Sequence, residues 1–505
     1  MSTTPTESTT DPRLAPIDLV CPECRETLAF TPASTQPLEG GIFGVLACQC
    51  SEYPVVDGIP VIRQGQVDVQ DHMTERAEVD GPTVARLVEL IRGDDPLESL
   101  VELLAFPPPT PMNLGSRPGV RLPFTRGPWP HLAHEARRGE VRALLGEIDS
   151  LTAQDWMELC YERSSDRING ELFPYFFIRF GQPRYLSSIS FLESLPKNSG
   201  PILDMACGFG HIMYHLSVRK NPIDSVGLDR NFFQLWVARR YIAPDQSYVC
   251  SGRLDSLPFA DDAFSASVCT DAFHLFPTQQ EAMDELRRIA KADTVLLDRI
   301  GNAELEPHDT DQERDPAGYV SLLRGAPWRL ACEDELFENY RAGRGVQLAT
   351  PRPPEDFTGR KWLALISSRD ESLFVDVDAF DGPPHGAGTL QINPIYRVER
   401  DESTDDVHLR FEFPSTWYAF ENSMMISYTS AGEWMDPKTF DALCEGLETD
   451  RTPYYLRRFV VLGMPPRYAR KPGTPPRFRS VAAGLRHGAR ERLTTVARQV
   501  GSHRP

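Results

Sequence analysis

The chain lacks long apolar runs. No stretch of about 18 consecutive apolar residues occurs in the sequence, so we predict no membrane-spanning helix. The first residues, MSTTPTESTTDP, have neither the basic start nor the apolar core of a secretory signal peptide. We therefore expect a cytoplasmic protein, with peripheral association at a membrane surface as an alternative.

The chain has few basic residues relative to acidic ones, except near its end. The net charge is −19, yet residues 451–505 hold 13 Lys and Arg against one acid, so the other 450 residues carry −31. This acidic body argues against broad nucleic-acid binding. The basic tail at 471–505 contains SVAAGLRHGARERLTTVARQV, which predicts an amphipathic helix with arginines opposite its apolar face. The tail could pack on the acidic body, lie on an anionic membrane surface or contact nucleic acid.

Cysteine is too sparse for a disulfide scaffold, with ten in 505 residues. Four of them are grouped as CPEC, 23 intervening residues and CQC. These are Cys21, Cys24, Cys48 and Cys50. Four thiolates in a tetrahedral array suit zinc, and a closed four-cysteine site is structural. We predict that Zn²⁺ here stabilises a fold too small for an adequate core of its own, with buried metal-free thiols as the alternative.

Composition and pattern divide the chain into six segments. We expect a disordered N-terminus at 1–16, a zinc-ribbon-like module at 17–63, a helical and proline-rich connecting region at 64–164, an α/β domain at 165–370, a strand-rich α+β appendage at 371–470 and the basic tail at 471–505. The connecting region includes PPPTPMNLGSRPGVRLPFTRGPWP, whose proline density excludes regular helix or sheet.

The α/β domain alternates short apolar strands with helical patterns. Strands are predicted at 201–204, 224–229, 247–251, 266–270 and 293–298. This alternation is typical of βαβ units and a parallel sheet. Residues 302–330 look like an irregular insertion, followed by a helix near 333–342 and strands near 345–349 and 361–367.

A glycine turn follows the first predicted strand, in LDMACGFGH at 203–211. The dinucleotide fingerprint needs a third glycine where this chain has Met213, so a ligand without a diphosphate is favoured over NAD or FAD. Asp229 lies 21 residues after Gly208, at the end of the second strand, where a carboxylate can accept hydrogen bonds from ribose hydroxyls. Asp271 stands at the tip of the fourth strand. Ligands of open α/β sheets bind at this carboxyl edge.

Residues 200–300 resemble a class I S-adenosylmethionine-dependent methyltransferase of the type 11-like group. LDMACGFGH is similar to the first motif of that family, VGLDRN to the second, and LPFADDAFSASVCTDAFHLF to its LPF-D-SFD-V segment. The resemblance implies a Rossmann-like domain with a mainly parallel seven-stranded sheet. In the same way, CPEC…CQCSEYPVVDGIPVI resembles the zinc-ribbon module of the tRNA-methyltransferase-activator family.

The methyltransferase resemblance also implies a set of S-adenosyl-L-methionine-binding residues. Asp204, Ala206, Gly208 and Gly210 would surround the methionine portion, Asp229 would hold the ribose, Arg253 and Leu254 would lie beside adenine, and Asp271 would lie near the amino-acid end. The family often has an acid where this chain has Arg253, and arginine has no hydrogen-bond acceptor. Asp255, a neighbouring residue or a backbone carbonyl would then accept from the adenine, or binding would be weaker.

His274 is the nearest candidate base, with packing or helix capping as the alternative. The aromatic segment 171–185 could form a lid through Tyr175, Arg179 or Tyr185, and core packing is the alternative. The sequence favours a methyltransferase acting on a small-molecule acceptor, sugar or lipid precursor. An RNA-modifying methyltransferase and a catalytically silent methyltransferase-fold scaffold are the alternatives.

Overall fold

The computed structural model describes residue 14 and residues 17–62, 81–93, 95–105, 129–162, 167–196, 200–308, 310–380 and 384–474. The chain divides into two compact units. Unit 1 comprises Met1–Glu147 and Gln182–Gly388, and unit 2 comprises Ile148–Gly181 and Thr389–Pro505. Residues 148–181 belong to the same unit as the C-terminal appendage. The sequence-based limits instead divide these residues between the connecting region and the α/β domain. Nearly all of the expected disordered start, most of the proline-rich stretch and most of the basic tail lie outside the described residues.

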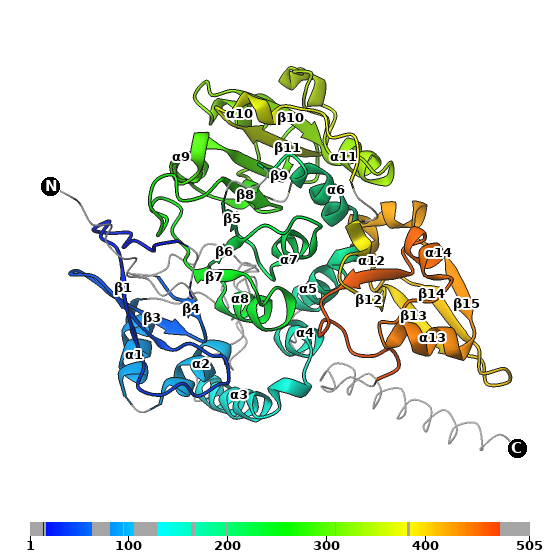
Figure 1. Cartoon of the computed structure of the whole chain (residues 1–505), viewed down its shortest axis with the longest axis horizontal. Coiled ribbons are helices and arrows are strands. Elements are labelled where there is room, and N and C mark those ends of the chain that lie inside the picture. The colour runs from blue at the N-terminus through cyan, green and yellow to red at the C-terminus, as the bar shows by residue number, and fades with distance from the viewer. Residues whose placement is uncertain are drawn as a thin grey trace, which may run out of the picture. The chain divides into compact units, whose positions relative to one another are not determined.

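A seven-stranded sheet forms the centre of unit 1, in the order β10-β11-β9-β8-β5-β6-β7 (Figure 1). Its strands are β5 (Ile202–Met205), β6 (Ser225–Asp229), β7 (Ser247–Cys250), β8 (Ala266–Thr270), β9 (Val295–Gly301), β10 (Trp328–Cys332) and β11 (Trp362–Ser367). The pairings from β9 through β8, β5 and β6 to β7 are parallel, and β11 runs antiparallel to both β9 and β10. The predicted Rossmann-like, mainly parallel seven-stranded sheet is confirmed.

Apolar sequence explains why these strands occupy the core. Every residue of β5 and of β9 is buried, as expected for parallel strands covered on both faces. The helices of unit 1 are α1 (Gly81–Arg92), α2 (Pro96–Leu104), α3 (Trp129–Leu145), α6 (Pro183–Leu192), α7 (His211–Val218), α8 (Phe232–Val237), α9 (Gln279–Arg288), α10 (Pro316–Ser321) and α11 (Glu333–Arg341). From β5 the chain continues to β6 and β7 on one side of the sheet and then to β8 and β9 on the other. In such sheets ligands bind at this switch point, which lies between the carboxyl ends of β5 and β8.

The N-terminal module is a four-stranded antiparallel sheet, β1 (Ala29–Pro32), β2 (Gly44–Ala47), β3 (Glu52–Val56) and β4 (Ile59–Pro60). It adds to the free edge of the large sheet, because Val61 forms a parallel bridge with Cys250 at the end of β7. The Ile62 amide also donates to the Cys250 carbonyl oxygen at 2.9 Å. The module is therefore built into unit 1 by backbone hydrogen bonds.

Unit 2 is strand-rich, as the sequence predicts. Its two sheets contain β12 (Thr389–Ile392) with β16 (Val461–Met464), and β13 (Tyr396–Arg400), β14 (Val407–Phe411) and β15 (Gly432–Met435). Its helices are α4 (Ala153–Met157), α5 (Arg167–Phe177), α12 (Thr416–Glu421), α13 (Pro437–Cys444) and α14 (Thr452–Arg457). All described strand pairings in these two sheets are antiparallel.

Two predictions along the α/β domain are wrong in detail. Residues 302–330 are not wholly irregular, since they contain α10 and most of β10. The strand expected near 345–349 is reduced to one bridge between Gln347 and Asp376. Its alternating Val346 and Leu348 are buried, but the backbone finds other partners, such as the Ser190 carbonyl oxygen. No helix among the described residues is both long and apolar enough to cross a membrane.

Candidate functional site

The turn after β5 contains three residues with positive φ, and two of them are glycines. Ala206, Gly208 and Gly210 have φ values of +59°, +53° and +70°. A Cβ atom on Gly210 would lie 3.1 Å from the Cβ of Ala238 and 3.2 Å from the Tyr248 hydroxyl, so both the φ angle and the packing favour glycine there. The turn therefore brings bare backbone to the carboxyl edge of the sheet, immediately before α7.

Asp229 receives hydrogen bonds from two directions at the tip of β6. The Gly208 amide donates to Oδ2 at 3.0 Å, and the Asn231 amide donates to Oδ1 at 2.8 Å. Burial raises the pKa of this carboxyl, while the two amides oppose the rise. A carboxylate offers about four acceptor positions, so Asp229 keeps capacity for further donors. The turn and the strand tip, 21 residues apart in sequence, thus form one site.

Asp204 is the most unusual carboxyl of this edge. Its side chain is 1% exposed, and neither carboxylate oxygen has a hydrogen-bond partner among the described residues. Burial, reinforced by the nearby charge of Asp229, raises the pKa of Asp204 to about 8. A buried carboxyl without donors costs free energy, so this position is suited to a ligand that brings a donor or a positive charge.

The loop after β7 holds the residues predicted to lie beside adenine. Arg253 forms a bidentate ion pair with Asp255, at 3.0 and 2.8 Å, and also pairs with Glu23 of the N-terminal module. Leu254 is half-buried. The Arg253 guanidinium is therefore held by acids of its own loop and of the module. Neither Arg253 nor its partner Asp255 is available as an uncommitted group.

Asp271 belongs to a buried charge network. Its carboxylate accepts from Arg299 at 2.5 Å and lies 3.5 Å from Arg184 of α6, and both arginines are 4% exposed. Arg299 also donates to Glu333 at 3.1 Å, and its guanidinium carbon lies 3.7 Å from the centre of the Trp362 ring. The structure thus pairs Asp271 with two arginines at the carboxyl end of β8, where its role includes bracing this edge.

Sequence reasoning missed these arginines. Arg299 follows Asp298, whose backbone carbonyl accepts the amide of Asp271 at 2.9 Å. Burial raises the pKa of Asp298 to about 7, although Ser188 donates to it at 2.5 Å. The signal that was available is the unusual polar sequence Asp-Arg inside the otherwise apolar β9, because buried charges in a strand require partners.

His274 and the three expected lid residues lie in different elements, and two of the lid residues belong to unit 2. His274 lies in a 3-10 helix after β8, is 1% exposed and contacts Trp362 edge-on with 5.6 Å between ring centres. Tyr185 is buried in α6. Tyr175 and Arg179 belong to unit 2, where the Arg179 guanidinium lies 4.5 Å from the Tyr175 ring centre. His274 stays a predicted base, and its burial favours the packing alternative.

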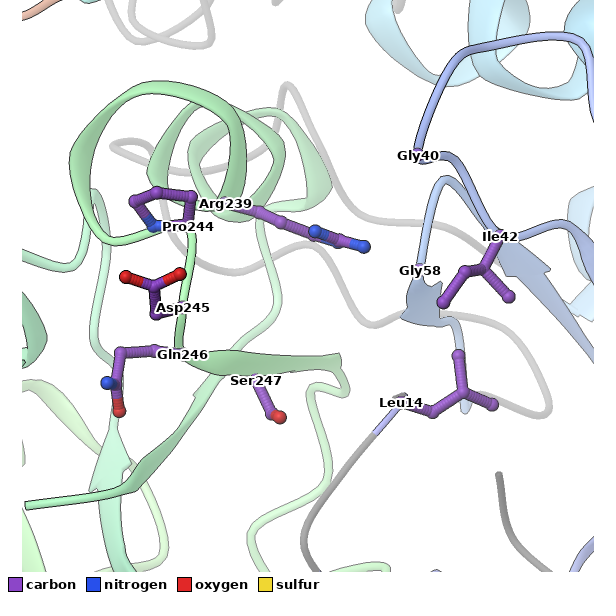
Figure 2. Close-up of a pocket in the computed structure, with 9 residues that line it drawn as sticks. All are labelled: Leu14, Gly40, Ile42, Gly58, Arg239, Pro244, Asp245, Gln246 and Ser247. Atoms are coloured by element: carbon purple, nitrogen blue, oxygen red, sulfur yellow. The ribbon is translucent and has the colours of Figure 1, made fainter. Parts of the chain in front are cut away.

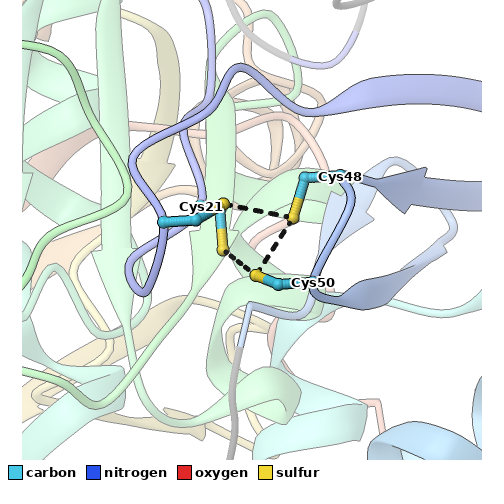
Figure 3. Close-up of side chains that lie close together, drawn as sticks. Cys21, Cys48 and Cys50 are labelled. Carbon is cyan, nitrogen blue, oxygen red and sulfur yellow. Dashed lines mark hydrogen bonds between the residues drawn. The ribbon is translucent and has the colours of Figure 1, made fainter.

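The four predicted metal ligands meet in space. The Sγ atoms of Cys21, Cys24, Cys48 and Cys50 all lie within 4.8 Å of one another. Figure 3 shows three of them facing a common centre, with Sγ separations of 3.6 Å for Cys21–Cys50 and 3.5 Å for Cys48–Cys50. Thiolates about 2.3 Å from one tetrahedral zinc lie roughly 3.8 Å apart, so the donor set fits that ion.

Cys21 is prepared to act as a thiolate. Its burial opposes ionisation, but the Tyr53 hydroxyl at 3.5 Å and the backbone amides of Cys24 and Glu23 bring its pKa down to about 6. Metal ligation requires the deprotonated sulfur. At Cys21 the local hydrogen bonds therefore favour the form that binds a metal ion, whereas the pKa of Cys48 is raised by burial and the pKa of Cys24 is also raised.

Comparison with known proteins supports the assignment of the central domain. Residues 203–297 match the family model described as a methyltransferase domain. A curated relative, phthiotriol/phenolphthiotriol dimycocerosates methyltransferase 1 of Mycobacterium ulcerans, is 26% identical over 147 residues, which cover 29% of this chain and 50% of the relative. The chain thus spans about half the length of this relative.

Solved structures give weak matches. A chain of the complex between the Haloferax volcanii Trm112 methyltransferase activator and a methyltransferase is 18% identical, with a TM-score of 0.28 and coverage of 37% of this chain and 90% of that chain. A TehB-like SAM-dependent methyltransferase from Corynebacterium glutamicum is 17% identical, with a TM-score of 0.26 and coverage of 36% and 87%. The assignment therefore rests on the family match and on the sheet described above. Residues 203–297 are similar to a methyltransferase domain and lie in the Rossmann-like sheet described above.

Proposed function

We propose that the protein is an S-adenosylmethionine-dependent methyltransferase acting on a small molecule, sugar or lipid precursor. The observation that carries this proposal is the placement of two acids, Asp204 and Asp229, beside the glycine turn, at the point where the strand order reverses. Dinucleotide sites use a similar edge, but the residue at the third glycine position is Met213, which is buried in α7. A ligand without a diphosphate fits this turn better.

The residues at this edge fit S-adenosylmethionine. Asp229 has acceptor positions left for two ribose hydroxyls after its two amide contacts. Asp204 offers a buried carboxyl without a donor to a cofactor that carries an ammonium group and a sulfonium centre. A cation nearby favours the ionised form of a carboxyl, so the cofactor would relieve the cost of burying Asp204.

In catalysis the cofactor supplies an electrophilic methyl group, and the protein supplies orientation. Asp204, Ala206, Gly208 and Gly210 would border its methionine portion, Asp229 its ribose, and Arg253 with Leu254 the adenine. The Asp271–Arg299–Arg184 network would keep the edge rigid, so that the acceptor approaches in line with the breaking bond. The buried His274 would act as a base only for an acceptor that reaches it.

The N-terminal module would hold Zn²⁺ through its four cysteines as a structural ion. We regard it as a zinc ribbon like that of the tRNA-methyltransferase-activator family, on the strength of CPEC…CQCSEYPVVDGIPVI. Among substrate classes, the Mycobacterium ulcerans relative, named for its phthiotriol and phenolphthiotriol dimycocerosates, favours the lipid precursor. The cytoplasm is the proposed location, and the basic tail would provide any contact with an anionic membrane surface or nucleic acid.

Calorimetric titration with S-adenosylmethionine and with its demethylated product tests the proposal. We expect both to bind, and Asp229→Ala to raise Kd at least tenfold, because hydrogen bonds to a charged group contribute about 1.5–3 kcal/mol each. Asp224→Ala is the matched control, since this exposed acid stands one residue before β6, at its opposite end. Failure of the zinc-loaded parent to bind either compound would favour the silent scaffold instead.

A further inference from the structure

A pocket lies in the seam between the N-terminal module and the edge of the large sheet, away from the glycine turn. It has a volume of about 340 Å³ and is lined by Gly40, Ile42 and Gly58 from the module and by Arg239, Asp245 and Ser247 from the methyltransferase side (Figure 2). All of these residues belong to unit 1. This volume is at the lower end of small-molecule sites, which span about 300–1,000 Å³.

Arg239 dominates this pocket. Arg239 is part of the π-helical turn Ala238–Ile242. Figure 2 shows its side chain extending across the seam toward Gly58 and Ile42. A Cβ atom on Gly58 would lie 2.3 Å from Arg239 Nη2 and 2.5 Å from its Nε. Gly58 also has a φ of +79°. A glycine is therefore needed at this position both for the turn and for the guanidinium that lies against it.

The two neighbouring arginines of the seam differ in their partners among the described residues. Arg240 binds Asp57 with two hydrogen bonds, Nε to Oδ2 at 2.8 Å and Nη2 to Oδ1 at 3.0 Å. The Trp236 ring nitrogen donates to the same Oδ2 at 2.8 Å, and Asp57 is 1% exposed. Arg239 forms no hydrogen bond or ion pair with any residue that the structure describes. Asp57 is thus committed to the neighbouring arginine.

No other described residue that lines the pocket forms an ion pair with Arg239. Asp245 is exposed and forms no ion pair with Arg239 within the described part of the chain. In Figure 2 the guanidinium extends away from Asp245, toward Gly58. Burial lowers the pKa of Arg239, and Arg240 acts in the same direction, whereas Asp57 opposes them. A partly buried, unpaired guanidinium favours a bound anion, and its fork of donors matches phosphate oxygens.

We infer that this seam pocket binds a small phosphate-bearing molecule, with the Arg239 guanidinium as its main contact and the Ser247 hydroxyl as a second donor. Such a ligand would touch both the module and the start of β7, so its binding would stabilise their association. This binding is independent of the proposed methyl transfer, because the glycine turn and Asp229 lie at the opposite, carboxyl end of the strands.

The test is thermal unfolding of the full, zinc-loaded chain titrated with inorganic phosphate, with sodium chloride keeping the ionic strength constant. We expect a saturable rise in Tm and a Kd that increases at least tenfold in Arg239→Gln. Arg344→Gln is the matched control, because this arginine is exposed in unit 1 and its side chain forms no hydrogen bond or ion pair with a described residue. Unchanged phosphate affinity in Arg239→Gln, or an equal rise with chloride, would overturn the inference.

A second variant and a second ligand complete the test. If Arg239→Gln fails to fold, Ser247→Glu is the second variant, because it leaves the arginine in place. The added carboxylate should repel phosphate and abolish the rise in Tm. A rise in Tm that persists in Ser247→Glu would reject the site. Titration with glycerol phosphate distinguishes the source, since tighter binding than phosphate indicates a phosphomonoester and equal binding indicates the free ion. S-adenosylmethionine binding should be unchanged in both variants, which separates this site from the proposed function.

Discussion

At the scale of single residues, Asp204 combines a cost in stability with a proposed role in cofactor binding. Its folded-state pKa of about 8 lies above the ordinary value of 3.8, so the folded chain keeps a proton that the unfolded chain releases between these values. This group therefore lowers stability progressively as the pH rises from about 4 to 8. We predict that Asp204→Asn raises the free energy of unfolding at pH 8.5 by about 1–3 kcal/mol and leaves it nearly unchanged at pH 4.

The same substitution should weaken cofactor binding about tenfold or more, because an amide cannot offer a negative charge to a cationic ligand. Denaturant unfolding at both pH values and calorimetry of the same samples measure the two effects. Asp224→Asn, which changes an exposed acid, should alter neither quantity. An Asp204→Asn variant that is less stable than the parent at pH 8.5 would contradict the assignment of Asp204 as a buried, unpaired carboxyl.

At the scale of elements, the first cysteine knuckle is joined to the loop after β7. Arg25 donates to the carbonyl oxygens of Leu257 and Phe259 at 3.0 and 2.9 Å, and Ser256 donates to Pro22 at 2.7 Å. We predict that zinc removal by a chelator lowers Tm and weakens S-adenosylmethionine binding without abolishing it, because the loop beside adenine loses its support. Metal analysis, thermal unfolding and calorimetry on the same samples check this.

Cys21→Ser should reproduce the effect of the chelator, with zinc content below one ion per chain. Cys444→Ser is the control, since this half-buried cysteine of α13 lies outside the cluster. Full zinc content in Cys21→Ser would count against the proposed metal site. A chelated protein with unchanged cofactor affinity would show that the knuckle and the loop act independently.

At the scale of the whole molecule, unit 2 is assembled from two distant stretches of chain. Arg470, near the C-terminal end of the described residues, binds Asp155 at 2.8 Å and Glu158 at 2.7 Å. Both acids are buried. Removing one partner of a buried ion pair leaves uncompensated charge and costs about 3–5 kcal/mol. We predict that Arg470→Gln destabilises unit 2 by this order, measured by scanning calorimetry.

Unit 1 provides the internal reference for this prediction. The demethylated cofactor should still bind Arg470→Gln with parental affinity, because the glycine turn, Asp204 and Asp229 belong to unit 1. Lys471→Gln is a matched control, since its exposed pair with Glu445 is worth less than about 1 kcal/mol. Equal effects of the two substitutions would contradict the importance of the buried pairs.

The sequence by itself determined the type of the central fold and the grouping of the cysteines. Short, mainly apolar runs such as Ile202–Met205 become strands because their side chains are buried on both faces of a parallel sheet. Positions that need positive φ, such as Gly208 and Gly210, are visible because glycine adopts that backbone at little cost. Local chemistry was sufficient for these features.

Only the tertiary structure decided which charges meet. The Arg184 and Arg299 contacts with Asp271 join residues 87 and 28 positions apart, and no local pattern specifies such pairs. The same holds for Asp57, which binds Arg240, whereas Arg239 pairs with no carboxylate in the part of the chain that the structure describes. Ion pairing depends on distance in space and on exclusion of water, and both are set by packing rather than by spacing along the chain.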